Sequence, residues 1–299
     1  MQSVTLPVAS SSSAVVVPPL LALDMDGTLL HDDKTIPEAN KAAVKQLSEW
    51  GTRIVLASGR MTPRLITYAE ELQVDATFIG YNGAECVLSS KEGRKRIVSS
   101  CIPAEEAARL FEWCDSRPYL LCVFLEDKVY VRDSAELKKE AENYTILNGD
   151  AFTWIPSYAK HLPGKAPTKA LIALSSQKEQ DELYEDMLLK FPKLHLIKSS
   201  CTNEHGVEQE YVEFTAKNVN KGTALIKLCE HLNLDINQVV SMGDGDNDIE
   251  MLQVAGYSVC MAQGKDEAKR AAKKISPFTN NDNGVAREIQ AILSSTTQN

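Results

Sequence analysis

The sequence Leu20-Leu21-Ala22-Leu23-Asp24-Met25-Asp26-Gly27-Thr28 begins apolar and ends in two acids, a glycine and a threonine. The apolar part is typical of a buried strand, and alternation along a strand directs Asp24 and Asp26 from its end in roughly the same direction. Two carboxylates placed together either share a proton or hold a cation. A D-x-D pair alone is common and is usually a metal site or a charged turn. The apolar strand before this pair and the Gly-Thr after it make phosphoryl chemistry a more specific prediction.

All-oxygen ligation suits Mg²⁺, which also neutralises a phosphate that an anionic oxygen must approach. One of the two carboxylates could then act as a nucleophile. Gly27 lets the backbone approach a ligand closely, and Thr28 adds a hydroxyl and an amide donor for a phosphate. These residues indicate a magnesium site suited to phosphoryl chemistry.

Length and composition predict a two-domain globular protein. The chain has 299 residues, of which 43% are apolar and 24% charged. The net charge of -9 argues against a nucleic-acid partner, because phosphate backbones favour basic surfaces, whereas a small phosphorylated substrate can be neutralised locally. Apolar runs stay well below the ~20 residues that a membrane span requires. We expect a monomer or a weak homo-oligomer that binds neither nucleic acid nor membrane.

The cysteines and residues 1–19 indicate the cellular compartment of the protein. The chain has 7 cysteines, an odd number without a C-x-x-C pair, which favours buried thiols in a reducing, cytoplasmic compartment. Residues 1–19 contain neither acidic residues nor the lysine and arginine that targeting segments carry. We expect a disordered tail there, with an organellar address as the alternative.

Periodicity predicts an α/β fold with a Rossmann-like parallel sheet and helices on both faces. Strands alternate with helices, and this order implies parallel pairing through right-handed crossovers. The expected elements are strands at 20–23, 53–57 and 77–81, a helix between Pro37 and Gly51, and a second helix at 63–72.

The pattern changes after residue 84, where 85–88 and 96–99 form a predicted hairpin. Residues 101–208 mix short helices with strands as an α+β insert. The parallel pattern is expected to resume at Tyr211–Phe214, followed by a helix from Lys221 and a strand at 238–242. The predicted core therefore comprises residues 20–100 and 209–299.

Four polar, glycine-bearing segments follow the predicted parallel strands. In open parallel sheets such segments meet in a crevice beyond the carboxyl ends of the strands. We expect them to converge there, with Lys221 nearby at a helix N-terminus. The segments are Asp24–Thr28, Ser58–Arg60, Asn82-Gly83 and Gly243–Asp248.

These residues resemble the haloacid dehalogenase superfamily of phosphatases, and within it the Cof-type group with a C2B-type α/β cap. DMDGTLL resembles the first motif, Ser58 in LASGR the second, Lys221 in NKGTAL the third and GDGDNDIEML the fourth. NGA at 82–84 and NDNGVA at 281–286 also match the group. The resemblance spans residues 20 to about 292 and makes the insert a substrate-specificity cap.

The resemblance implies a division of labour among the motif residues. Asp24 would be the nucleophile that forms an aspartyl-phosphate. Asp26 would protonate the leaving alcohol and then deprotonate the hydrolytic water. Ser58 and Lys221 would hold the phosphoryl oxygens together with Thr28.

The resemblance also implies a Mg²⁺ site. Its ligands would be Asp24, the backbone carbonyl of Asp26, and Asp244. Asp248 would support Lys221 or a metal-bound water without touching the metal, and Asn247 would touch the metal site or the substrate. The candidate substrate-binding residues are Gly59, Arg60, Asn82 and Asn247.

The motif residues, taken one at a time, also have interpretations other than phosphoryl transfer. Ser58 alone is most often a turn hydroxyl, and Lys221 alone a solvated helix residue. Asp244, Asp246 and Asp248 could form a calcium loop, but the spacing of that loop and its distal glutamate are missing. Arg60 and Asn82 are as well explained by structural roles.

Three further features concern the crevice. The histidines share no motif, and among them His205 is the candidate to face the crevice. Gln263-Gly264 departs from the Asn-Ala of many relatives and affects loop geometry rather than chemistry. The insert offers polar candidates for substrate contact at Glu126, Lys128, Tyr130, Arg132 and Lys169.

The sequence favours a magnesium-dependent phosphoric monoester hydrolase acting on small phosphorylated metabolites, such as sugar phosphates, under a mobile cap. One alternative is a phosphotransferase or phosphomutase with the same aspartyl-phosphate. The other is a catalytically idle binding protein on this scaffold. An activity assay distinguishes the three. A hydrolase releases free phosphate, a mutase forms an isomeric sugar phosphate, and an idle protein is inactive across a broad panel of phosphate esters.

Overall fold

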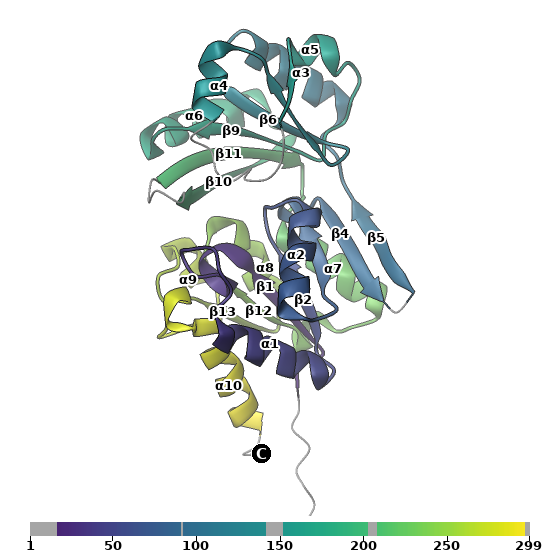
Figure 1. Ribbon diagram of the computed structural model, residues 1–299, viewed down its shortest axis with the longest axis vertical. Coiled ribbons are helices and arrows are strands. Elements are labelled where there is room, and N and C mark those ends of the chain that lie inside the picture. The colour runs from purple at the N-terminus through teal and green to yellow at the C-terminus, as the bar shows by residue number, and fades with distance from the viewer. Residues whose placement is uncertain (1–16, 91, 142–151, 203–207, 297–299) are drawn as a thin grey trace, which may run out of the picture.

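The computed structural model describes residues 17–90, 92–141, 152–202 and 208–296. These residues form two stacked lobes, a core and a cap (Figure 1). The core holds an eight-stranded sheet in the order β14-β13-β12-β1-β2-β3-β4-β5, parallel apart from the antiparallel pairs β3–β4 and β4–β5. Its strands are β1 (Leu20–Asp24), β2 (Arg53–Ala57), β3 (Thr77–Gly80), β4 (Glu85–Ser90), β5 (Gly93–Ser99), β12 (Val240–Gly243), β13 (Tyr257–Cys260) and β14 (Lys274–Ile275).

Helices cover both faces of the core sheet, which confirms the predicted fold class. Helices α1, α2 and α10 pack on one face, and α7 and α8 pack on the other. The core helices are α1 (Glu38–Glu49), α2 (Thr62–Leu72), α7 (Lys221–Leu232), α8 (Ile249–Val254), α9 (Asp266–Ala271) and α10 (Gly284–Thr296).

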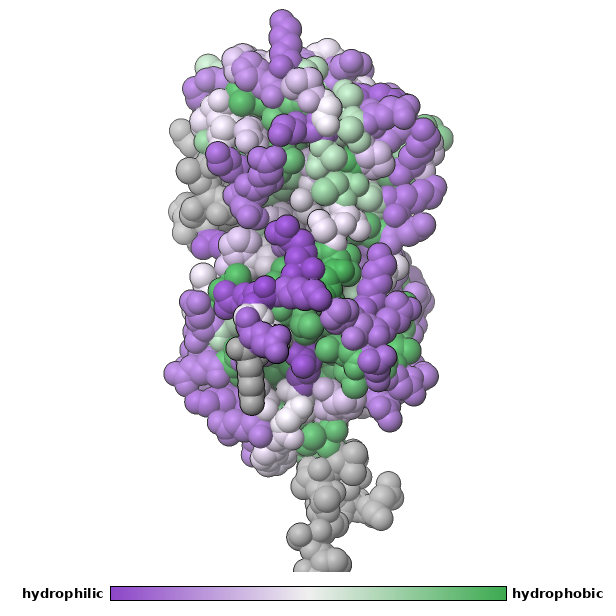
Figure 2. All heavy atoms as spheres, turned by 90° about the vertical axis from the view of Figure 1, so that its right-hand side faces the viewer, coloured by the Kyte–Doolittle hydropathy of each residue, from purple (hydrophilic) through white to green (hydrophobic). Residues whose placement is uncertain are grey.

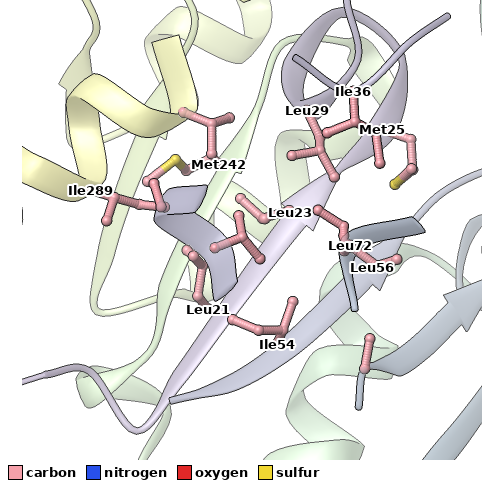
Figure 3. Packing of buried hydrophobic residues seen from close by; sticks show 14 of the residues in the cluster. Leu21, Leu23, Met25, Leu29, Ile36, Ile54, Leu56, Leu72, Met242 and Ile289 are labelled. Carbon is pink, nitrogen blue, oxygen red and sulfur yellow. The ribbon is translucent and has the colours of Figure 1, made fainter. Parts of the chain in front are cut away.

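Successive side chains of β1 point to opposite faces of the core sheet and pack in the hydrophobic clusters on both faces. Leu21 and Leu23 point into the cluster under α1 and α10, where they lie with Met242 and Ile289 (Figure 3). Leu20 and Ala22 belong to the cluster under α7. Each residue of β1 is buried, so hydrophobic burial on both faces fixes the register of the strand, and Asp24 lies at its carboxyl end.

The cap holds a six-stranded sheet in the order β10-β11-β9-β6-β7-β8. One sheet face packs against α3, α5 and α6, while the other meets α4 and the core residues Met61 and Tyr81. Its elements are α3 (Ala104–Asp115), β6 (Leu120–Leu125), β7 (Lys128–Arg132), α4 (Ala135–Ala141), β8 (Phe152–Ile155), α5 (Tyr158–His161), β9 (Lys169–Leu174), α6 (Gln177–Lys190), β10 (Leu194–Thr202) and β11 (Glu208–Ala216).

One predicted strand belongs to the other sheet. Tyr211–Phe214, expected to resume the parallel core, lies in β11 and pairs antiparallel with β10 and β9 of the cap. The cap sheet therefore extends to Ala216, beyond the boundary expected at residue 208. The composition of a buried strand does not specify which sheet it joins, because pairing partners are chosen in three dimensions.

The outer edge of the core sheet is charged. Strand β5 forms this edge, and residues 93–96 are exposed, including Arg94, Lys95 and Arg96. Figure 2, viewed from the side of β5 in Figure 1, shows hydrophilic residues over much of this face. Charged edge strands resist pairing with other chains. Within the described ranges, no helix is long and apolar enough to cross a bilayer.

Candidate active site

A pocket of about 160 Å³ lies where the strand ends of the core face the cap sheet. Seven of the site residues predicted in the core line it: Asp24, Asp26, Ser58, Gly59, Arg60, Asp244 and Asn247. The structure thus brings the first, second and fourth predicted segments to one place. Asn82, in the remaining segment, contacts the fourth segment, because its Oδ1 accepts a hydrogen bond from Nδ2 of Asn247 at 3.0 Å.

Lys221 contacts Asp24, which lines the pocket, but does not line the pocket itself. Helix α7 begins at this lysine behind an Asn220–Thr223 capping box, in which each side chain accepts from the other residue's backbone amide. Its fully buried Nζ lies 2.5 Å from Oδ1 of Asp24 and 2.7 Å from Oδ1 of Asp248. Although burial opposes a charged lysine, the two carboxylates raise the pKa of Lys221 above its usual value. The lysine is therefore a fixed cation beside Asp24.

Three carboxylates gather at this point. Oxygen atoms of Asp24, Asp244 and Asp248 all lie within 4.8 Å of one another. Burial and the neighbouring charge of Asp248 raise the pKa of Asp24 to about 7 despite Lys221. Burial and the charge of Asp24 likewise raise the pKa of Asp244 well above its usual value. One lysine leaves this cluster with excess negative charge, and buried oxygen donors of this kind fit a hard cation such as Mg²⁺.

Asp248 differs from Asp24 and Asp244 in its hydrogen bonds. Its Oδ1 accepts from Lys221, and its Oδ2 accepts from the backbone amides of Asp244 and Gly245, at 3.0 and 2.9 Å. These partners occupy both oxygens, which leaves Asp24 and Asp244 as the freer carboxylates for a cation. Asp248 thus contacts both Lys221 and the backbone of the fourth segment.

Thr28 and Gly27 shape the position of Asp244. The hydroxyl of Thr28 is fully buried and donates to Oδ1 of Asp244 at 2.7 Å, so here it orients a carboxylate. Gly27 has φ +77°, and a Cβ atom at this position would overlap the carboxyl of Asp244. Glycine is therefore needed both for its conformation and for the close approach of Asp244.

Asp26 is held away from the three-carboxylate cluster. Arg60 Nε and Nη2 donate to its two oxygens, each at 2.7 Å, and Lys34 Nζ lies 3.0 Å from Oδ1. Burial opposes ionisation, but these two cations hold the pKa of Asp26 well below its usual value. Arg60, expected to contact substrate, therefore contacts the second aspartate while it lines the pocket.

Backbone bonds connect the Ser58 loop to the Asn82 loop. Ser58 donates its amide to Ile79 at 2.9 Å, its carbonyl accepts from Asn82 at 3.0 Å, and Arg60 accepts from Tyr81 at 2.9 Å. Ser58 is nearly buried and lines the pocket. The two loops are thus hydrogen-bonded to each other, and the Ser58 loop lines the pocket.

The structure adds residues that the sequence did not single out. Glu213, Ser199, Lys198 and Lys265 line the pocket. Glu213 and Ser199 come from cap strands, where each looks like an ordinary polar residue of an alternating strand. Asp246, which belongs to the predicted fourth segment, also lines the pocket.

Among the cap candidates, Lys169 lines the pocket. Arg132 instead donates to the carbonyls of Asp115 and Arg117 at 2.5 and 2.6 Å within the cap, and Glu126 pairs with Lys165. His205 lies outside the described residues, and no histidine of the described ranges lines this pocket.

The departure at Gln263 has a structural explanation. Its Nε2 donates to the carbonyl of Gly27 at 2.6 Å, and its Oε1 accepts from the amide of Asn280 at 3.2 Å. This side chain therefore ties the first loop to the loop before α10.

Comparison with known proteins agrees with this geometry. The chain matches the family model described as haloacid dehalogenase-like hydrolase over residues 21–289. It is 28% identical to the Bacillus subtilis 5-amino-6-(5-phospho-D-ribitylamino)uracil phosphatase YcsE, covering 91% of this chain and 94% of the relative. It is 26% identical to the phosphatase YwpJ of the same organism, covering 92% and 99%. The crystal structure of TM0651 from Thermotoga maritima superimposes with a TM-score of 0.74 at 29% identity, covering 91% of this chain and 97% of that one.

Proposed function

This chain belongs to the haloacid dehalogenase-like hydrolases and is a phosphatase, and from this premise we propose a magnesium-dependent phosphomonoesterase that works through an aspartyl-phosphate. Its proposed substrates are small phosphorylated metabolites such as sugar phosphates. The observation that carries the proposal is the buried contact of Lys221 with Asp24, which lines the pocket. A nucleophile, a fixed cation and further carboxylates beyond neighbouring strand ends suit phosphoryl transfer.

In the first half-reaction, an oxygen of Asp24 would attack phosphorus while the bond to the leaving oxygen breaks. Lys221 and Ser58 would stabilise the charge on the transferred group. Asp26 would give its proton to the leaving oxygen, which requires that Arg60 and Lys34 move from its carboxyl, because both favour the ionised form.

In the second half-reaction, Asp26 would take a proton from water, and the resulting oxygen would attack the phosphorus of the aspartyl-phosphate. The bond to Asp24 then breaks and inorganic phosphate leaves. Asp24, Asp244 and the carbonyl of Asp26 would hold Mg²⁺, which supplies positive charge to the transferred phosphoryl group when bound.

The substrate class rests on two observations. The pocket is small, and its lining places Lys198, Arg64 and Asn247 beside the aromatic ring of Phe124. The relative YcsE is named for a phosphorylated ribityl compound, a phosphate ester of a polyol chain. Phosphorylated sugars and polyols are therefore the first compounds to assay.

The test is release of free phosphate from a panel of such esters with Mg²⁺. Asp24→Asn should abolish turnover, and Asp33→Asn, a change in an exposed aspartate of the neighbouring loop, should not. Turnover of Asp24→Asn at the wild-type rate would rule out Asp24 as the nucleophile. An isomeric sugar phosphate without free phosphate would indicate a mutase.

A further inference from the structure

A buried ion pair of the cap reaches into two loops of the catalytic core. Nζ of Lys169, on β9, lies 2.7 Å from Oε2 of Glu213, on β11. Both side chains are about 95% buried, with exposed fractions of 4% and 5%. Buried charges require several partners at once, and each member of this pair finds part of its partners in the core.

Glu213 contacts the Asn82 loop. Its Oε2 accepts from Nδ2 of Asn82 at 2.8 Å, while Oδ1 of Asn82 accepts from Nδ2 of Asn247 at 3.0 Å. On the cap side, its Oε1 accepts from the hydroxyl of Ser199 at 2.5 Å. A chain of side-chain hydrogen bonds thus runs from a cap strand to the fourth catalytic segment.

Lys169 contacts the Ser58 loop. Its Nζ donates to the carbonyl of Gly59 at 2.8 Å and lies 5.0 Å from the ring centre of Phe124. A Cβ atom on Gly59 would lie 3.0 Å from Oδ1 of Asn82, so the two core contacts adjoin each other. The ion pair therefore bridges two loops that carry residues of the proposed mechanism.

We propose that Lys169 and Glu213 are positioning residues, through which the closed cap sets the geometry of the Ser58–Arg60 loop and of Asn247. This inference rests on the proposed phosphatase mechanism. When the cap lifts, the pair stays together, since both members belong to the cap sheet, but its bonds to Gly59 and Asn82 break. When the cap closes, both charge-assisted bonds form again. Catalytic geometry is then complete only over a substrate that permits closure.

Three variants separate positioning from simple stability. Lys169→Met and Glu213→Gln each leave a buried charge without its counter-ion, so each should unfold at a lower temperature than the wild type. The double variant carries neither charge and should regain most of that stability. It still lacks a donor for the Gly59 carbonyl, so its kcat should stay about 10- to 100-fold below wild type, with KM changed less than about 3-fold.

Glu106→Gln is the matched control. Glu106 is a buried cap carboxylate paired with Arg109 and Lys193, both of the cap. It should lose stability without a comparable loss of kcat. A double variant that regains wild-type kcat together with its stability would overturn the proposal, as would a Glu106→Gln variant that loses kcat equally.

A measurement that needs no turnover separates this inference from the proposed function. Hydrogen–deuterium exchange of peptides covering residues 57–61 and 80–84 should be faster in the double variant than in the wild type and in Glu106→Gln. Unchanged exchange would overturn the positioning role. A wild type that releases phosphate from no ester of the panel would refute the phosphatase mechanism, while the exchange result would still report whether the ion pair orders these loops.

Discussion

The Nζ atom of Lys221 lies 2.5 Å from Oδ1 of Asp24, and the lysine is fully buried. The same nitrogen contacts Asp248, so one cation is shared between two carboxylates of a cluster that also includes Asp244. The lysine therefore both holds the proposed nucleophile in place and reduces the repulsion that would otherwise destabilise the folded site.

Removal of this cation should affect both stability and turnover. Lys221→Met leaves the carboxylates without their buried partner, and the free energy of unfolding should fall by about 3–5 kcal/mol. kcat should fall by about 100- to 1,000-fold, because a donor to the transferred phosphoryl group is lost. Denaturant unfolding and phosphate release measure the two effects. Lys227→Met, an exposed change on the same helix, is the control, and equal losses in both variants would contradict the assignment.

Without bound Mg²⁺, the stability of the protein should depend on pH through the ionisation of Asp24. Its pKa is raised to about 7 by burial and by Asp248, so the folded state binds this proton more tightly than the unfolded chain does. This group therefore lowers stability as pH rises from about 4 to 7. Mg²⁺ requires the carboxylate, so the increase in Tm caused by Mg²⁺ should be larger at pH 8 than at pH 6. Equal Mg²⁺-induced shifts at both pH values would contradict this expectation.

Gly27 should be far less replaceable than another glycine of similar conformation. Gly27→Ala brings a Cβ atom into the carboxyl of Asp244 at φ +77°. Gly51→Ala is the matched control, because Gly51 has φ +98° and its Cβ would meet nothing within 4 Å. Both variants should lose about 1 kcal/mol of stability from the backbone conformation. Only Gly27→Ala should also weaken Mg²⁺ binding, measured by calorimetry; intact binding in that variant would show that the contact is dispensable.

Arg60 should control the ionisation of Asp26. In Arg60→Met the bidentate partner is lost, and the pKa of Asp26 should rise toward its usual value, because Lys34 alone remains beside it. Carboxyl ¹³C NMR titration measures this shift. Arg64→Met, in the first turn of α2 and also lining the pocket, should leave the titration of Asp26 nearly unchanged. The same titration curve in Arg60→Met and wild type would disprove the coupling.

The core elements could be predicted closely because each is encoded in a contiguous segment. Strand β2 was expected at 53–57 and found at Arg53–Ala57, and helix α2 was expected at 63–72 and found at Thr62–Leu72. Hydrophobic periodicity and the glycine and proline residues at their ends specify such elements locally. The membership of β11 in the cap sheet could not be predicted this way, since it depends on pairing with β10 and β9.

The sequence by itself determined the strand ends at which Asp24, Ser58 and Asp244 lie, because alternation and the parallel order of strands bring those ends to one edge. Only the tertiary structure decided that Arg60 binds Asp26 and that Lys169 and Glu213 reach the catalytic loops. The pair Asn82–Glu213 is separated by 131 positions along the chain and joins a loop of the core to the cap sheet. Local periodicity records which face of an element is buried, whereas contacts between buried polar groups depend on how whole elements pack together.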